Sequence, residues 1–257
     1  MRIIFTTSCK PISNDKIKTM QYNSINSWKW LDCEKEILVF NRDSSIKEMC
    51  DELEIKNIND YESSDFSDLP TWRAMRNVAC EFASENDIIV WVNSDIVFDD
   101  TLVHTINELK KSGLDDFILT GKRKNWPIFW ELNNKEEINK IEFDKIGNEY
   151  EIDYFIYNKK HFSDLPKFFI ARMKFDNYLM KLSIDSVEKT IDSTFAINSY
   201  HHEHGYGPDL NKSWMDASLN DPEFEFDRKI NQMLSPIANI NDCKYHIKME
   251  NKKIIFI

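Results

Sequence analysis

The chain has 257 residues, of which 42% are hydrophobic and 30% are charged, a composition that excludes disordered and fibrous proteins. Its net charge of −11 argues against nucleic acid as a partner, because non-specific binding to polyanions requires a basic surface. The five cysteines are scattered and form no Cys-x-x-Cys pair, so we expect neither a disulfide framework nor a zinc ribbon. A reducing cytoplasm is therefore the predicted location. No apolar run reaches the roughly 18 residues of a membrane span, so no transmembrane segment is expected, and peripheral attachment to a membrane stays open.

The first half of the chain alternates short apolar runs with longer amphipathic stretches. The apolar runs are RIIFTT at 2–7, EILVF at 36–40, DIIVWV at 87–92 and DFILTG at 116–121. Runs of this length, separated by helix-length segments, are typical of β-α units around a mostly parallel sheet. Residues 1–121 are therefore predicted to form a Rossmann-like half.

After residue 121 the pattern becomes α+β. It comprises an aromatic stretch at 125–134, a strand EIDYFIY at 151–157, an amphipathic helix at 171–182, a strand TIDSTFAINSY at 190–200, and a final strand pair around 249–253. No linker rich in proline, glycine or serine separates the halves. Residues 122–257 are therefore expected to close over the first half within a single domain of residues 1–257.

A helix is predicted to begin after Leu69-Pro70, with Asp68 as its N-cap. Its apolar face consists of Trp72, Met75, Ala79 and Phe82, which recur at helical spacing. Arg73 and Arg76 share another face with Asn77, and two arginines on one stripe can hold a diphosphate. A solvated helix face is the commoner outcome for such a stripe.

The strand DIIVWV runs directly into Asn93, Ser94 and Asp95. In open α/β sheets, ligands bind beyond the carboxyl ends of the strands, which makes Asp95 a candidate metal ligand with Asn93 beside it. Mg²⁺ and Mn²⁺ commonly join one or two carboxylates to substrate phosphates. The following residues, Asp99 and Asp100, are expected to cap the next helix.

Histidines cluster in YHHEHGYGP at 200–208, which holds three of the six histidines of the chain. Their spacing does not match the HExxH motif of zinc hydrolases. We expect a loop that carries His201 and His204 over a metal at the strand end, the alternative being a solvated polar loop.

Farther upstream, Asp176 lies near the start of the predicted helix at 171–182, where it is either an N-cap or a general base.

Taken in order, these blocks resemble the GT-A superfamily of nucleotide-sugar-dependent glycosyltransferases. More closely, they resemble a group of small GT-2-like enzymes from plants, bacteria and large viruses, which includes the rhamnosyltransferase domain of a multidomain chlorovirus glycosyltransferase. The blocks are TTSCKPI, INSWKWL, ILVFNRD, IIVWVNSDI, FILTGKR, EIDYFIY, LPKFFIARMKFDNYLM, TIDSTFAI and HHEHGY, which span nearly the whole chain. Two departures stand out: the metal motif is Asn-Ser-Asp rather than Asp-x-Asp, and GKRKNWPIF differs from the usual tryptophan-aspartate block.

The resemblance implies an α/β GT-A fold with a nucleotide-binding half at 1–121 and an acceptor-binding half at 122–257. It implies a metal-dependent, inverting transfer of a sugar from a nucleoside diphosphate, most commonly UDP, to a hydroxyl of a glycan or glycoconjugate acceptor. A sugar-nucleotide nucleotidyltransferase is the first alternative, although TTSCKPISNDK lacks the glycines of its phosphate loop. A catalytically inactive glycan-binding or scaffold relative is the second.

The resemblance also assigns roles to individual residues. Asp95, with His201 or His204, would hold Mn²⁺ or Mg²⁺, and Asp176 would be the catalytic base. Contacts to the nucleoside diphosphate sugar would come from Thr6, Thr7, Lys10, Asp43, Arg73, Arg76, Asn93, Lys122 and Arg123. Trp126, Trp130 and Tyr206 are expected in the core first, with stacking on sugar faces as the alternative.

Overall fold

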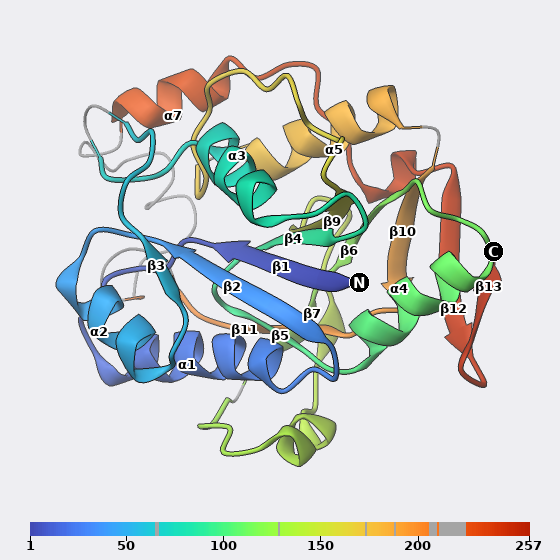
Figure 1. Cartoon of the computed structure of the whole chain (residues 1–257), viewed down its shortest axis with the longest axis horizontal. Helices are drawn as coiled ribbons and strands as arrows, with labels where there is room; N and C mark the ends of the chain where they lie inside the picture. The colour runs from blue at the N-terminus through green and yellow to red at the C-terminus, as the bar shows by residue number, and fades with distance from the viewer. Residues whose placement is uncertain (65–66, 128, 173, 188, 206–209, 211–224) are drawn as a thin grey trace.

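The computed structural model describes residues 1–64, 67–127, 129–172, 174–187, 189–205, 210 and 225–257 (Figure 1). The first half of the chain contains β1 (Arg2–Thr7), α1 (Asp15–Lys29), β2 (Glu34–Phe40), α2 (Ser44–Glu52), β3 (Lys56–Ile58), α3 (Trp72–Phe82), β4 (Ile88–Val92), β5 (Ile96–Phe98), α4 (Thr101–Lys111) and β6 (Ile118–Lys122). The second half contains β7 (Lys124–Trp126), η1 (Lys135–Lys140), β8 (Lys145–Ile146), β9 (Ile152–Asn158), α5 (Phe175–Ser186), β10 (Thr190–Phe195), β11 (Ser199–His202), α7 (Glu225–Gln232), η3 (Ile240–Asp242), β12 (Tyr245–Glu250) and β13 (Lys253–Phe256).

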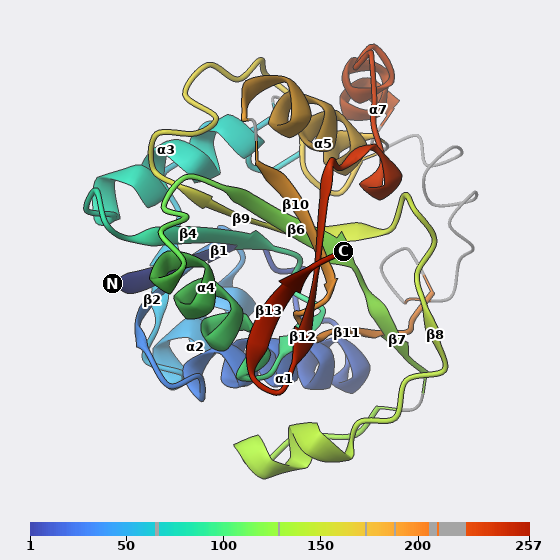
Figure 2. The ribbon, with the colours of Figure 1, turned by 90° about the vertical axis from the view of Figure 1, so that its right-hand side faces the viewer.

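In the described part of the chain, the central sheet has nine strands in the order β13-β12-β10-β6-β9-β4-β1-β2-β3. Neighbouring strands are parallel except where β9 pairs with β4 and β6 and where β13 pairs with β12. Figure 2 shows the β12–β13 hairpin at one edge of this sheet. The predicted α/β fold with a mostly parallel sheet is confirmed, and strands from both halves of the chain build the sheet.

Helices cover both faces of the central sheet. Side chains of α1, α2 and α4 pack on one face in a core that includes Trp28, Met49 and Leu102. Side chains of α3 and α5 pack on the other face, with Met75 and Leu179 among them (Figure 1). Burial on both faces explains why β1, β4 and β9 read as nearly continuous apolar runs rather than as alternating sequences. Among the described helices, none combines the length and the apolar character needed to cross a bilayer.

The segment predicted as a single strand at 190–200 is two strands in different sheets. After β10, the backbone N–H groups of Ala196 and Ile197 both bond to the carbonyl oxygen of Ser193, at 2.9 Å each, and turn the chain. The following strand, β11, joins a four-stranded sheet in the order β5-β11-β7-β8. The single-strand prediction was wrong because the apolar pattern continues through the turn.

The N-cap of α3 is Thr71, not Asp68. The Thr71 Oγ1 atom accepts the backbone N–H of Ala74 at 3.1 Å, whereas the Asp68 carboxylate bonds to Arg42 at 2.9 Å. A chain passing through Leu69-Pro70 is still extended, so the helix begins two residues after the proline.

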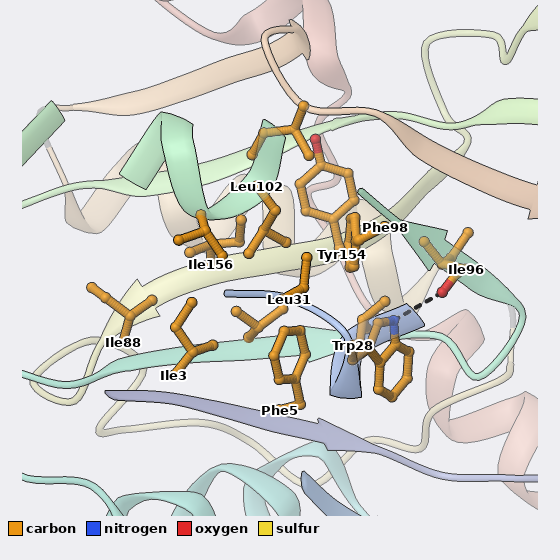
Figure 3. Packing of buried hydrophobic residues seen from close by; sticks show 14 of the residues in the cluster. Ile3, Phe5, Trp28, Leu31, Ile88, Ile96, Phe98, Leu102, Tyr154 and Ile156 are labelled. Carbon is orange, nitrogen blue, oxygen red and sulfur yellow. Dashed lines mark hydrogen bonds between the residues drawn. The ribbon is translucent and has the colours of Figure 1, made fainter. Parts of the chain in front are cut away.

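Trp28 of α1 connects the helix to the strands near the end of β4 (Figure 3). Its indole ring stacks on Phe5 of β1 with a centroid distance of 5.4 Å, and its Nε1–H donates to the carbonyl oxygen of Ile96 at 3.0 Å. Ile96 directly follows Asp95, so this bond fixes the backbone immediately after the candidate metal ligand.

Trp28→Phe is expected to lower the free energy of unfolding by about 1–2 kcal/mol more than Trp72→Phe does. Both indoles are fully buried, but the Trp72 Nε1–H has no hydrogen-bond partner among the described residues, so only Trp28→Phe removes a bond and leaves a buried carbonyl oxygen without it. Urea unfolding of the two variants measures the difference. Equal losses would show that the bond to Ile96 contributes nothing.

Candidate metal and catalytic site

Strand pairing brings the histidines to the carboxyl end of β4. The chain turns at Asn93–Asp95 and re-enters a strand, β5, which pairs antiparallel with β11 so that His201 lies opposite Ile96. His201 therefore stands beside Asp95, and His204 follows shortly after the end of β11. The expectation of a loop was wrong for His201, because β11 pairs with strands on both sides and its histidines are buried.

The structure brings Asp95, His201 and His204 together. The Asp95 Oδ2 atom lies 3.1 Å from His204 Nε2 and 3.8 Å from His201 Nε2, and ligand atoms of the three residues all lie within 4.8 Å of one another. The three side chains are 16%, 6% and 4% exposed for Asp95, His201 and His204. Asp95 Oδ1 and His201 Nδ1 are buried and have no hydrogen-bond partner among the described residues. These orphaned atoms and the donor set of one carboxylate and two imidazoles fit a divalent cation.

The protonation states also suit a metal ligand set. Burial lowers the pKa of His201 far below its usual value, so this imidazole is neutral and carries a free lone pair. Burial alone would raise the pKa of Asp95, but the hydrogen bond from His204 and the Lys10 ammonium outweigh it and hold this pKa well below the usual range. The pKa of Lys10 is itself lowered by burial, against the attraction of Asp95. Lys10 thus belongs to the same charged cluster.

A second buried carboxylate, Asp153 at the start of β9, stands next to this cluster. Its Oδ1 accepts from Asn93 Nδ2 at 2.7 Å, and its Oδ2 accepts from an Arg123 N–H at 3.3 Å. Arg123 also donates to Glu151 at 2.6 Å. Burial raises the pKa of Asp153, although two N–H donors on its two oxygens favour the ionised form. Asp153 was missed from the sequence, where the signal was a charged residue inside the apolar run EIDYFIY.

Asp176 lies in the first turn of α5 but is not its N-cap. That position is Lys174, whose φ is 67°, and the Asp176 Oδ1 atom accepts the N–H of the next residue, Asn177, at 2.8 Å. The residue is partly exposed, but its carboxyl group is packed inside the protein, and this desolvation raises its pKa to about 7. The Asp153 charge adds to the increase, and Arg123 opposes it. An acid of this pKa can exchange a proton near neutral pH.

The residues expected to bind the nucleoside have different environments. Thr6 and Thr7 are fully buried within β1, so they are not a surface for a nucleoside, and that expectation is corrected. The backbone of Lys10 bonds at both its N–H and its carbonyl oxygen to Gln21 of α1, which holds Lys10 beyond the end of β1. Asp43 caps α2 by accepting the N–H of Ser45 at 2.9 Å.

The structure does not bring Arg76 to Asp95. Its guanidinium donates to the carbonyl oxygens of Lys159 and His161, at 2.7 and 3.1 Å. These residues follow Asn158, which pairs with the first residue of β4, at the end of the strand away from Asp95. At about 3.3 Å per residue, the length of β4 separates Arg76 from Asp95 by roughly 15 Å. Arg76 is therefore corrected to a structural residue. Arg73 pairs with Glu62 at 2.7 Å on the surface.

The basic and aromatic residues that follow β6 fall into two groups. Lys122 ends β6 beside Arg123, and its backbone N–H donates to Thr194 Oγ1 at 2.9 Å. Trp126 is 1% exposed and belongs to the core, as first expected, whereas Trp130 is 39% exposed. Tyr206 lies outside the described residues.

No protein-family model matches the chain. No curated protein matches it either. Among solved structures, the chain is similar to residues 1–349 of S. aureus TarS, with 14% identity, coverage of 62% of this chain and 47% of that chain, and a TM-score of 0.38. It is also similar to a 4-diphosphocytidyl-2C-methyl-D-erythritol synthase from Anaerococcus prevotii, with 11% identity, coverage of 90% and 98%, and a TM-score of 0.41. A third similar structure is the inositol-1-phosphate CTP transferase from T. maritima, with 13% identity, coverage of 91% and 98%, and a TM-score of 0.40.

The chain spans about half the length of the TarS fragment that it matches. At these identities and TM-scores, the similarities carry no argument about the reaction. The functional argument therefore depends on the residues of the site.

Asp176→Asn is expected to stabilise the protein more at pH 8 than at pH 5. The folded protein keeps the Asp176 proton up to pH about 7, whereas an unfolded aspartate releases it near pH 4. The folded state therefore binds more protons between these values, and the free energy of unfolding falls as the pH rises through this window. Asparagine cannot ionise, so the variant should gain roughly 1–3 kcal/mol at pH 8.

Thermal unfolding at pH 5 and pH 8 measures this effect. Asp185→Asn, at an exposed position on the same helix, is the matched control and should show no such pH-dependent gain. A pH-independent difference between Asp176→Asn and the parent protein would contradict the raised pKa.

Proposed function

We propose that the protein is a metal-dependent, inverting glycosyltransferase that moves a sugar from a nucleoside diphosphate donor to a hydroxyl of a glycan or glycoconjugate acceptor. The observation that carries the proposal is the cluster of Asp95, His201 and His204 at the carboxyl end of β4. This is the position where open α/β sheets bind their ligands. A carboxyl group of pKa about 7, Asp176, stands near the same cluster, with Asp153 and Arg123 as its charged neighbours.

Asp95, His201 and His204 would hold the cation. Two imidazoles favour a transition metal such as Mn²⁺ over Mg²⁺, which prefers oxygen ligands. When bound, the cation would supply positive charge against the diphosphate that departs from the donor. UDP is the proposed carrier on the strength of the sequence resemblance.

The remaining roles follow from the charges of the chain's own residues. The half-buried Lys10, whose ammonium acts on the charge of Asp95, adds positive charge where the diphosphate would lie. Asp176, deprotonated above its pKa of about 7, would accept the proton of the acceptor hydroxyl as that oxygen attacks the anomeric carbon. Attack from the face opposite the departing diphosphate inverts the anomeric configuration.

A sugar-nucleotide nucleotidyltransferase is the second candidate, and Lys10 is the observation that favours it. A half-buried lysine just after the first strand, near the proposed metal ligand Asp95, would also suit the α-phosphate of a nucleoside triphosphate. The two reactions differ in their products: a nucleotidyltransferase releases pyrophosphate, and a glycosyltransferase releases a nucleoside diphosphate.

Calorimetric titration with UDP is expected to show binding that depends on Mn²⁺ and is lost in Asp95→Ala. The reason is that Asp95, with His201 and His204, would hold the cation, which would supply positive charge for the diphosphate. Asp116→Ala is the matched control, because Asp116 also pairs with a histidine, His161 at 2.7 Å, and should leave UDP binding unchanged. UDP binding that is equally tight without Mn²⁺, or in Asp95→Ala, would contradict the proposed metal site.

Incubation with a panel of nucleoside diphosphate sugars and Mn²⁺ is expected to release nucleoside diphosphate, and Asp176→Asn should reduce this turnover by at least about 100-fold, the scale of general-base catalysis. UDP binding should survive in Asp176→Asn. Release of pyrophosphate from a nucleoside triphosphate and a sugar 1-phosphate would instead select the nucleotidyltransferase. Nucleotide-independent glycan binding without turnover would select the scaffold alternative.

A further inference from the structure

His202 lies between His201 and His204 in the sequence but is not part of the proposed metal site. Its side chain contacts the backbone of Asp95. Its side chain is fully buried, and its ring lies between Trp126 and Phe129, with centroid distances of 4.9 and 4.7 Å. His202 Nδ1 lies 2.9 Å from the backbone carbonyl oxygen of Asp95, and His202 Nε2 lies 3.2 Å from Asn23 Nδ2 on α1. The imidazole therefore bridges Asp95 and the first helix.

The backbone groups around Asn23 and His202 determine which atoms of these two side chains donate and which accept. The N–H of Leu132 can only donate, and it meets Asn23 Oδ1 at 2.8 Å; the carbonyl oxygen of Trp130 can only accept, and it meets Asn23 Nδ2 at 2.7 Å. The Asn23 amide thus has one orientation, and its second N–H points at His202 Nε2, which must accept. The Asp95 carbonyl oxygen can only accept, so His202 Nδ1 carries the proton. The imidazole is neutral and has one tautomer.

We propose that His202 is a positioning residue for the metal site: its Nδ1–H holds the backbone of Asp95 so that the Asp95 carboxylate faces His201 and His204. The inference rests on the proposed metal site, because the orientation of Asp95 matters only if its carboxylate binds a cation. The carbonyl oxygen of Asp95 also accepts the backbone N–H of His202 at 3.2 Å, so His202 makes two hydrogen bonds to this oxygen. Through Asn23, the same chain of bonds anchors Asp95 to α1 and to the segment at 130–132.

Two substitutions separate this role from simple packing. His202→Phe keeps an aromatic ring between Trp126 and Phe129 but removes both nitrogen atoms. His202→Asn leaves a hole but restores an N–H near the place of Nδ1, from which it can donate to the Asp95 carbonyl oxygen. Positioning predicts tighter Mn²⁺ binding by His202→Asn than by His202→Phe, whereas packing predicts the opposite order.

The experiment is a titration with Mn²⁺ alone, followed by the electron paramagnetic resonance signal of the free ion. His202→Phe should weaken Mn²⁺ binding by roughly 10–100-fold, the usual effect of losing a group that orients a metal ligand, and His202→Asn by less. His246→Phe is the control, because His246 also pairs with an aspartate, Asp192 at 2.9 Å, and should leave the affinity unchanged. Equal affinities for parent and His202→Phe, or the reverse order of the two variants, would overturn the role of His202. Absence of Mn²⁺ binding by the parent protein would instead overturn the metal site on which the inference rests.

A measurement on the unmodified protein covers the case in which a variant does not fold. Nitrogen-15 spectra of the histidine side chains, recorded without metal, should include a neutral imidazole protonated at Nδ1 that loses its Nε2 hydrogen bond, and therefore shifts, in Asn23→Ala. If the imidazole that responds to Asn23→Ala carries its proton at Nε2, the bond to Asp95 does not exist and the proposal fails.

Discussion

The pairing of β11 with β5 is the constraint on which the rest of the site depends. Its register places His201 opposite Ile96, next to Asp95, and puts His202 where it reaches the Asp95 carbonyl oxygen. A shift of one residue would exchange the faces of these two histidines, because side chains alternate across a strand. One ladder of backbone hydrogen bonds therefore decides which imidazole meets the carboxylate and which meets the backbone.

Two carboxylates are buried side by side at the ends of neighbouring strands, and each is neutralised differently. Asp95 is stabilised by the hydrogen bond from His204 and by the Lys10 ammonium, and Asp153 by Arg123 and Asn93. Burying charge costs several kcal/mol per ion unless partners and hydrogen bonds offset it. The chain maintains both arrangements without forming a simple apolar core at this edge of the sheet, which is the pattern expected where buried charge serves a ligand.

Local patterns in the sequence predicted what depends on local chemistry. The α/β architecture, the apolar strands and the helix that carries Asp176 could be predicted, because burial on two faces and helical spacing leave clear traces. The proximity of Asp95, His201 and His204 also followed from the residue types and the resemblance. Long-range contacts could not be predicted. Asp153 lies at the site because β9 pairs antiparallel with β4. Arg76 lies away from the site because its guanidinium bonds to carbonyl oxygens far along the chain. The turn after β10 was hidden because its hydrogen bonds involve backbone atoms alone.

The reversed strand β9 has a consequence for how the chain must fold. In the sheet order, β9 separates β4 from β6, although both of those strands precede it in the chain. During synthesis from the N-terminus, β4 therefore exposes an unpaired apolar edge until residues 152–158 are available, and β6 has no partner until then, because its other neighbour, β10, comes still later in the chain. The sheet can be completed only by inserting a late strand between two early ones, a non-local step that slows folding. A fragment that stops before β9 would leave one edge of β4 and both edges of β6 unpaired, which makes it a candidate for aggregation rather than an independent nucleotide-binding unit.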